Sequence, residues 1–316
     1  MKRSKTLLRL RQDWRLYVIL ALPVTYIFLF SYLPMYGVQI AFRDYQPGLG
    51  FTGSPWVGFQ WYRDFFNSFF WDRLLVNTFL LNVYGLLWGF PVPIILAIML
   101  HHMNNRRYRK FIQTTIYSPN FISAVVVVGM LYLFLNPSHG VINRAIMAMG
   151  KDSVFFMNRA DWFRTIYIAS GIWQTAGYGT IIYFAALHSI SPELYEAASV
   201  DGALRWHKIW YIDIPSLMPL AITFLIMRAG QLMWSETPRT LLMQEPGNLM
   251  TSNTLGPWIY RFGLTGQTGI GDLNPGQPML SYGAAIGLMM NVINIILLVA
   301  VNTIAQKTGD GESSLW

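Results

Sequence analysis

Long stretches without a charged residue dominate the pattern of this chain. Five of them are longer than the roughly 20 residues that an α-helix needs to cross a bilayer, and they cover 16–42, 74–105, 111–143, 165–192 and 273–306. A sixth segment, 216–234, carries one charge, Arg228, which a span tolerates when it faces protein or water. The pattern predicts an all-α integral membrane protein with six transmembrane helices within 16–306.

Polar connections of unequal length separate these spans. External segments are predicted at 43–73, 136–164 and 236–280, and cytoplasmic ends at 1–15 and 307–316. The first external segment is dense in aromatic side chains, which favours packing on the membrane surface or on other external loops. The other two are long for simple connections, which indicates external binding loops.

The third and fourth spans are placed at about 121–135 and 165–187. Two spans also contain glycine pairs at the four-residue spacing that lets helices approach closely. These pairs are Gly85 with Gly89 and Gly283 with Gly287. The spacing is compatible with helix packing inside the subunit and with a contact between subunits.

The composition supports a lipid environment. The 316 residues are 53% hydrophobic and 16% aromatic but only 12% charged, which is about half the charged share of a soluble domain. One water-soluble core cannot hide that much apolar surface. Because the chain has no cysteine, disulfides, iron–sulfur clusters and thiolate metal sites are excluded.

The Lys and Arg residues set the orientation. Most of them lie in the N-terminal segment, in the 101–110 loop and at Arg205, Lys208 and Lys307, close to span ends. The positive-inside rule therefore predicts that both termini are cytoplasmic. The net charge of +8 is compatible with nucleic-acid binding, but these residues flank spans instead of forming one patch. Anionic lipid headgroups explain them, and no nucleic-acid partner is expected.

The stretch 188–215, between the fourth and fifth spans, opens with a helix-start signal. Ser191 is a candidate N-cap, Pro192 suits the first helical position, and Glu193 complements the positive end of the helix dipole. The sequence therefore predicts a short helix that begins at Pro192 on the cytoplasmic side.

A turn and a second amphipathic segment are expected to follow. Asp201-Gly202 is expected to end the first helix, and 203–213 then mixes apolar with basic residues. Pro215 is expected to end the second segment before span five. The result is a predicted helix-turn-helix at the inner membrane face.

This stretch contains a spaced motif: Glu196-Ala197-Ala198, then Gly202, then Ile212-Asp213-Ile214-Pro215. It resembles the EAA loop of binding-protein-dependent ABC importer permeases, E-A-A-x3-G-x9-I-x-L-P. The one departure is Ile214 in place of Leu, a substitution of similar volume. The surrounding sequence resembles the carbohydrate branch. Residues 33–37 and 314–316 resemble its LplB-type subgroup for complex oligosaccharides, which includes an alginate importer permease.

The resemblance covers nearly the whole chain and implies both a function and a set of partners. It implies a transmembrane permease subunit of an ATP-driven oligosaccharide importer in the bacterial plasma membrane, with an acidic or complex substrate such as alginate favoured. It also implies a second homologous permease, two ATPase subunits that bind ATP and Mg²⁺, and an external solute-binding protein. The ATPase-coupling residues would be Glu196, Ala197, Ala198, Asp201, Gly202 and Pro215.

Physical chemistry gives this loop a role without reference to the family. A stiff helix-turn-helix between two spans can sit in a groove of a cytoplasmic ATPase and turn its closure into a rigid-body motion of the membrane helices. Ala197 and Ala198 allow close approach, and Glu196 offers an acceptor to a partner donor. The alternative is an amphipathic hairpin at the membrane surface with no partner.

Catalytic machinery is not expected on this chain. It has no G-x-x-x-x-G-K-[ST] phosphate loop, and the string Gly266–Gly271 lacks the required lysine, so ATP hydrolysis must belong to another chain. The five histidines are scattered in the sequence, with no carboxylate or histidine at ligand spacing on a shared helix face, and no metal site is expected.

Polar residues inside the spans are candidates for a substrate pathway. At 1.5 Å per residue, Arg228 stands about 20 Å from the inner face. It is predicted to share a helical face with Phe224, Gln231 and Ser235. The complete candidate set is Arg228, Gln231, Trp173, Gln174, Asn82 and Asn291. These groups suit sugar hydroxyls, a carboxylate or a stacked ring. The alternative is that they hold helices together.

Two other classes of protein predict sequence features that can be compared with this chain. A secondary transporter driven by an ion gradient predicts inverted repeats and carboxylates inside the spans, whereas every carboxylate lies outside the spans as assigned. A membrane-bound enzyme predicts a catalytic constellation, which the sequence lacks.

Overall fold

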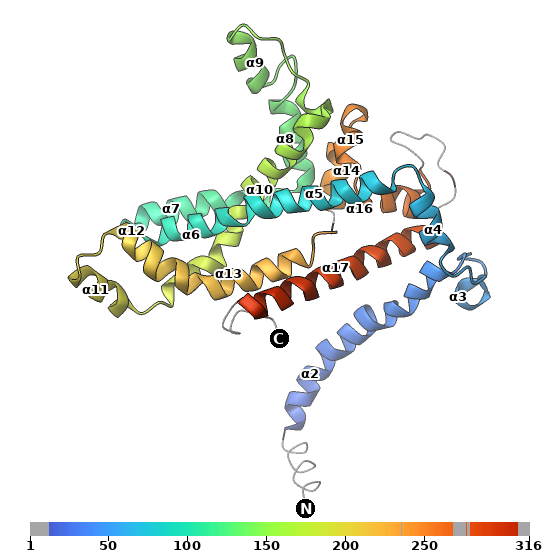
Figure 1. The fold of residues 1–316 in the computed structure, drawn as a ribbon, viewed down its shortest axis with the longest axis horizontal. Helices are drawn as coiled ribbons and strands as arrows, with labels where there is room; N and C mark the ends of the chain where they lie inside the picture. The colour runs from blue at the N-terminus through green and yellow to red at the C-terminus, as the bar shows by residue number, and fades with distance from the viewer. Residues whose placement is uncertain (1–12, 235, 268–275, 277–278, 309–316) are drawn as a thin grey trace, which may run out of the picture.

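The computed structural model describes residues 13–234, 236–267, 276 and 279–308 (Figure 1). Four sets of residues used above therefore lie outside the described part, wholly or in part: the basic residues of 1–12, Ser235, most of 266–271, and 314–316. Within the described part the chain is helical, and its one β-type contact is an isolated antiparallel bridge between Arg43 and Trp56.

Four continuous helices of the described part are long and apolar enough to cross a bilayer. The first, Trp14–Phe42, consists of α2 (Trp14–Ile27), a π-helical turn and a 3₁₀ segment. The second, Trp71–His101, joins α5 (Trp71–Gly89) to α6 (Pro91–His101). The third, Arg205–Ala229, joins α12 (Arg205–Lys208), a π-helical turn (Ile209–Asp213) and α13 (Ile214–Ala229). The fourth is Leu280–Lys307 of α17 (Leu280–Thr308). These helices coincide with predicted spans one, two, five and six.

The prediction for the third span was wrong in its geometry. Helix α7 (Arg106–Tyr117) and the 3₁₀ turn Ser118–Phe121 meet α8 (Ala124–Phe134) at an angle of 99°. Pro119 lies in the first turn of the 3₁₀ segment, and Ser123 restarts the helix by accepting the Val126 amide at 3.4 Å. Helix α8 has 11 residues, about 16 Å of rise, and is too short to cross alone.

The fourth predicted span forms α10 (Ala160–His188), a helix of 29 residues that is not among the four that are long and apolar enough to cross. By length and apolar composition the described residues therefore give four spanning helices, or five if the bent pair counts as one.

Pro215 does not end a helix, contrary to the sequence prediction. The helix continues from Arg205 to Ala229 through the π-helical turn Ile209–Asp213. Because this turn changes the backbone hydrogen-bond register, Pro215, which has no N–H, stands at the beginning of the α-helical ladder of α13 and not inside it.

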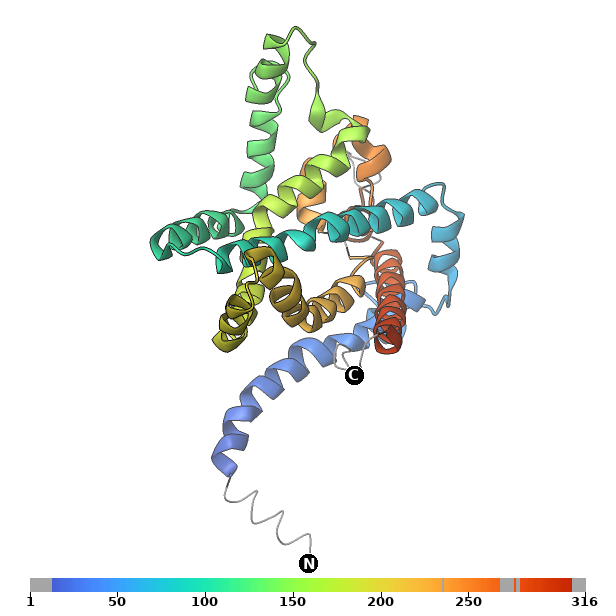
Figure 2. The ribbon, with the colours of Figure 1, turned by 60° about the vertical axis from the view of Figure 1, so that its left-hand side comes forward.

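The helices form an elongated body with different structures at its two ends. Figure 1 shows α5, α6, α13 and α17 along the long axis, with α11 (Pro192–Val200) and α12 at one end and α3 (Gly50–Gly53) and α4 (Gln60–Asn67) at the other. Helices α8 and α9 (Val141–Ala148) project sideways, and α2 diverges from the body, as Figure 2 shows from another side.

The remaining short elements belong to the segments predicted as external. After α13 the chain forms α14 (Thr237–Met243), α15 (Leu249–Ser252), α16 (Leu255–Ile259) and a π-helical turn, Tyr260–Thr265. Two 3₁₀ turns, Phe156–Asn158 and Pro246–Asn248, complete the set.

Apolar packing is divided among three buried clusters. One joins α4, α5, α16 and α17 through residues that include Phe65, Leu74 and Leu255. A second joins α6, α10 and α13, next to the 188–215 stretch; its members are Ala97, Ile98, Tyr183, Leu187, Leu217 and Ala221. The third lies between α5, α8, α10 and α14. The second cluster makes the three helices that reach the 188–215 stretch one packed unit.

The two glycine pairs contain one glycine at a close backbone contact, Gly283, and two glycines with open space around them. A methyl group on Gly283 would lie 2.9 Å from the Cα atom of Gly263, so this glycine allows a close approach within the subunit. A methyl group on Gly85 or Gly287 would meet no atom of the chain within 4 Å.

Gly177 offers a test of the packing of α10 on α7. A Cβ atom there would collide with the carbonyl oxygen of Ile116, which is backbone and cannot swing away. Gly177→Ala is expected to destabilise the protein by about 1–3 kcal/mol, measured as a lower midpoint of thermal unfolding in detergent. Gly85→Ala is the matched control and is expected to leave the midpoint unchanged or raise it. Equal midpoints for the two variants would contradict this packing.

Candidate functional site

The 188–215 stretch begins as predicted. The Ser191 side chain accepts the Glu193 amide at 3.3 Å, and Pro192 occupies the first turn of α11. Gly202 has φ of +75°, a conformation that suits glycine. The Asp201 amide bonds the Ala197 carbonyl at 3.0 Å. Ser191 and Gly202 therefore define the two ends of α11.

Two further bonds fold the turn back on α11. The Ala203 amide donates to the Ala198 carbonyl at 2.8 Å, and the Lys208 ammonium donates to the Ser199 hydroxyl at 2.6 Å. The second bond links α12 to α11 directly. The helix-turn-helix is thus held by its own contacts.

Exposure divides α11 into two faces. Tyr195 and Ala198 are half-buried, whereas Glu196 and Ala197 are exposed. Val200, at the tip, has 89% of its surface exposed. Asp201, Gly202 and Pro215 are also exposed, although Pro215 lies on α13, away from the tip. Of the six predicted coupling residues, five therefore lie together around α11, and their exposed face is free to meet another chain.

Asp213 is the anchor of this stretch, and the sequence analysis missed it. Its side chain is fully buried. One carboxylate oxygen accepts the Tyr195 hydroxyl at 2.5 Å, and the other lies 2.6 Å from Nε2 of His102, directly after α6. In the motif Asp213 occupies a variable position between two isoleucines. An unexplained carboxylate at the edge of an apolar run was the available signal.

The Tyr195 phenol acts as a hydrogen-bond donor here. Burial raises its pKa, and the hydrogen bond and charge of Asp213 raise it further. The phenol therefore stays protonated at neutral pH, and Asp213 accepts its proton in a hydrogen bond.

Three histidines that are scattered in the sequence, His101, His102 and His188, lie together next to Tyr195 of α11. The ring of His101 is 5.4 Å from that of His102, 5.1 Å from that of His188 and 5.7 Å from that of Tyr195. No group of three or more possible ligands among the described residues is arranged to hold a metal ion. The rings of His101, His102 and His188 form edge-to-face contacts, and together with Tyr195 they join α6, α10 and α11.

The candidates Asn82 and Gln174 bond to the backbone. The Asn82 amide donates to the Trp234 carbonyl at 2.7 Å and to the Thr78 carbonyl at 2.8 Å. The Gln174 amide donates to the Ile122 carbonyl at 2.8 Å, at the break between α7 and α8. The Asn82 amide thus links α5 to the chain after α13, and the Gln174 amide links α10 to the break between α7 and α8.

Arg228, Gln231, Trp173 and Asn291 are exposed. Arg228 lies in the last turn of α13, but the helix ends at Ala229, so Gln231 does not continue the helical face that the sequence predicted. Of the six pathway candidates, four are thus exposed and two, Asn82 and Gln174, hold backbone carbonyls of other segments.

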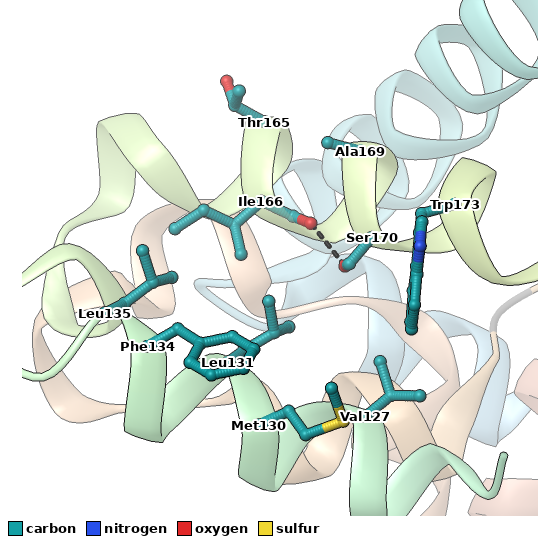
Figure 3. Close-up of a pocket in the computed structure, with 10 residues that line it drawn as sticks. All are labelled: Val127, Met130, Leu131, Phe134, Leu135, Thr165, Ile166, Ala169, Ser170 and Trp173. Carbon is teal, nitrogen blue, oxygen red and sulfur yellow. Dashed lines mark hydrogen bonds between the residues drawn. The ribbon is translucent and has the colours of Figure 1, made fainter. Parts of the chain in front are cut away.

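An apolar cavity of about 380 Å³ lies between α8 and α10, and one pathway candidate, Trp173, lines it (Figure 3). The indole stands at one edge of the cavity, and the Ser170 hydroxyl bonds the Ile166 carbonyl at 2.5 Å. The other lining residues are Val127, Met130, Leu131, Phe134, Leu135, Thr165 and Ala169. With so apolar a lining, the cavity does not suit sugar hydroxyls.

Comparison with known proteins gives a consistent result. Residues 89–310 match the family described as the binding-protein-dependent transport system inner membrane component. Protein LplB of Bacillus subtilis (strain 168) is 39% identical over 298 residues, which cover 94% of this chain and 90% of LplB. The polygalacturonan/rhamnogalacturonan transport system permease protein YteP of the same organism is 35% identical over 309 residues, 98% of this chain and 93% of YteP.

Solved structures agree with these sequence matches. A crystal structure of a bacterial ABC transporter involved in the import of the acidic polysaccharide alginate contains a chain with a TM-score of 0.84 and 35% identity. The match covers 97% of this chain and 100% of that one. A crystal structure of a bacterial alginate ABC transporter in complex with an alginate pentasaccharide-bound periplasmic protein matches with a TM-score of 0.82 and 35% identity, over 95% of this chain and 96% of that one.

The left-handed turn at Gly202 gives a prediction for the loop. Gly202→Ala meets no neighbouring atom within 4 Å, so its effect is the cost of this backbone conformation, about 1 kcal/mol. Hydrogen exchange of the 193–203 amides is expected to quicken about fivefold. Gly129→Ala in α8, also without a neighbour within 4 Å, should leave these amides unchanged. Wild-type exchange in Gly202→Ala would show that the turn is not held as described.

Proposed function

The chain belongs to the family of binding-protein-dependent transport system inner membrane components, and from this premise we propose that residues 196–215 couple it to a separate ATPase. It is a permease subunit of an ATP-driven, binding-protein-dependent sugar importer. The proposal is carried by the exposed face of α11, whose opposite face is anchored on a buried carboxylate. The sequence alternative of an ion-gradient-driven transporter is set aside on the family assignment.

The substrate we propose is an acidic oligosaccharide. YteP is named for polygalacturonan and rhamnogalacturonan, and the solved relative takes part in the import of alginate. These polysaccharides carry carboxylates. Arg228, an exposed cation in an otherwise uncharged helix, is a suitable partner for a sugar carboxylate.

The topology we propose has six spans. It counts α10 as the fourth and the pair α7–α8 as a broken third span. Non-helical backbone at membrane depth is tolerated where protein groups satisfy it, and the Gln174 amide does so at Ile122. Both termini are placed in the cytoplasm by the positive-inside rule. This topology puts α11 and α12 on the same side as the ATPase.

The assembly we propose contains a second homologous permease, two ATPase subunits and an external solute-binding protein. A relative was solved in complex with a periplasmic protein. The span that begins with α2 has none of its apolar window buried inside the chain and diverges from the body (Figure 2). Lipid and a partner permease would cover it. ATP and Mg²⁺ would bind to the ATPase subunits, and this chain would perform no catalysis.

Purification tests the assembly. The tagged wild-type chain is expected to bring down a second permease and ATPase subunits. Glu196→Ala removes an exposed acceptor, and retention of the ATPase subunits after washing should fall roughly tenfold, the value of one charge-assisted hydrogen bond. Glu193→Ala, in the exposed first turn of the same helix, is the control with wild-type retention. Transport by the purified lone chain would contradict the proposal.

Uptake tests the role of Arg228. Arg228→Ala is expected to reduce transport of alginate or oligogalacturonate fragments by about tenfold or more in proteoliposomes, because one ionic hydrogen bond is lost. Arg228→Lys keeps the charge and should retain part of the activity. The neighbouring exposed Met227→Ala should transport normally. Wild-type uptake by Arg228→Ala would remove Arg228 from the pathway.

A further inference from the structure

We propose that Asp213, held by Tyr195 and His102, is the positioning group that carries the motion of the coupling helix α11 into both α6 and α13. This inference rests on the proposed function. It assigns a transmission role to a residue at a variable position of the EAA pattern. Its structural basis is the meeting of three elements at one buried carboxylate.

The carboxylate is held from two directions. Oδ1 accepts the Tyr195 hydroxyl at 2.5 Å, and Oδ2 pairs with His102 Nε2 at 2.6 Å. The Tyr195 hydroxyl donates to one oxygen, and the other oxygen pairs with the His102 ring nitrogen, so both carboxylate oxygens have a partner. With its side chain fully buried, Asp213 has no water to replace either partner. A shift of one partner must therefore displace the carboxylate or break a hydrogen bond.

The three groups belong to different parts of the fold. Tyr195 lies in the middle of α11, His102 follows the last residue of α6, and Asp213 ends the π-helical turn that continues into α13. The backbone joins α11 only to α10 and α12. The Tyr195 bond adds a direct connection from α11 to the base of α13, and the His102 bond extends it through Asp213 to the end of α6.

A second set of contacts extends this connection to α10. The ring of Tyr195 lies 5.7 Å from that of His101, which lies 5.1 Å from that of His188. His188 in turn lies 4.2 Å from Phe184 of α10. Beyond these rings, the buried cluster that includes Ala97, Leu187 and Leu217 packs α6, α10 and α13 together. Displacement of α11 therefore acts on three helices that move as one unit.

The chemistry of the site also favours a directional role over simple stabilisation. Burying a charged pair costs desolvation free energy, and apolar residues of similar volume often stabilise a fold equally well. Apolar contacts resist compression but separate easily. Hydrogen bonds to a carboxylate resist both pushing and pulling. Asp213 is thus suited to transmit a displacement of α11 in either direction during an ATPase cycle.

Spin-label distances test the proposal without reference to the sugar. The chain has no cysteine, so labels can be placed at Met103→Cys, next to His102, and at Val200→Cys, at the tip of α11. The protein is the full complex in lipid, measured without nucleotide and after trapping with ATP and vanadate. In the otherwise wild-type chain the 103–200 distance is expected to be the same in both states, because the two positions move together.

Breaking the site should separate the two positions. Tyr195→Phe removes one hydroxyl, and Asp213→Asn replaces an acceptor with an amide donor. In each variant the 103–200 distance is expected to shift by about 1–5 Å on trapping, the range of helix displacements in switching proteins. The double variant should shift no more than the single ones, because both break one network. Tyr211→Phe, at an exposed tyrosine in the same stretch, is the control with an unchanged distance.

The outcomes separate the inference from the proposed function. If Tyr195→Phe and Asp213→Asn both keep the wild-type distance in both states, or if the wild-type distance itself changes on trapping, the inference is overturned. Tyr195→Phe keeps the test decisive if Asp213→Asn fails to fold. If the purified wild-type chain brings down no ATPase subunit and its preparation hydrolyses no ATP, the proposed function itself is refuted.

Discussion

The need to satisfy backbone polar groups in a largely apolar chain governs this structure. Continuous helices satisfy most of them internally, but the described part also contains abrupt breaks. Amide side chains from other elements cap several of these: Gln174 bonds the Ile122 carbonyl between α7 and α8, and Asn82 bonds the Trp234 carbonyl after α13. Asn143 donates to the Leu135 and Asn136 carbonyls before α9 and to the Val154 carbonyl after it, each at 3.0 Å. These bonds let the chain bend while its backbone carbonyls keep hydrogen-bond partners.

The 188–215 stretch, which we propose couples to the ATPase, is packed at its base and exposed at its tip. At the base, Asp213 is buried and bonded on both oxygens, next to the packed cluster of α6, α10 and α13. At the tip, Gly202 turns the chain, and Glu196 and Val200 face outward. A part that receives force from another subunit needs both properties. The substrate chemistry proposed for the pathway depends on separate residues at greater distance from the loop.

Local signals in the sequence predicted local structure well. Uncharged runs gave four continuous spanning helices, Ser191 capped α11, and Gly202 formed the left-handed turn. The prediction for the third span missed the break between α7 and α8 because Pro119 and Ser123 interrupt the apolar run without adding a charge. The effect of Pro215 was misjudged because a π-helical turn precedes it and absorbs the missing donor.

Tertiary contacts explain what sequence patterns left open. His102 and Asp213 are 111 residues apart, so no spacing rule could pair them. Asn82 and Gln174 were weighed as pathway residues or as helix contacts, and their hydrogen bonds run to backbone 152 and 52 residues away. The family motif spans the stretch that contains the anchor, but the anchor lies at one of its variable positions.

Cross-linking from single cysteines tests the central claim, that the α11 tip meets the ATPase. In the purified complex, Val200→Cys is expected to cross-link to an ATPase subunit. Phe69→Cys, at an equally exposed apolar side chain near the opposite end of the body, is expected to cross-link to no ATPase subunit. Cross-linking of the ATPase from position 69, or from neither position in a complex that hydrolyses ATP, would contradict the account.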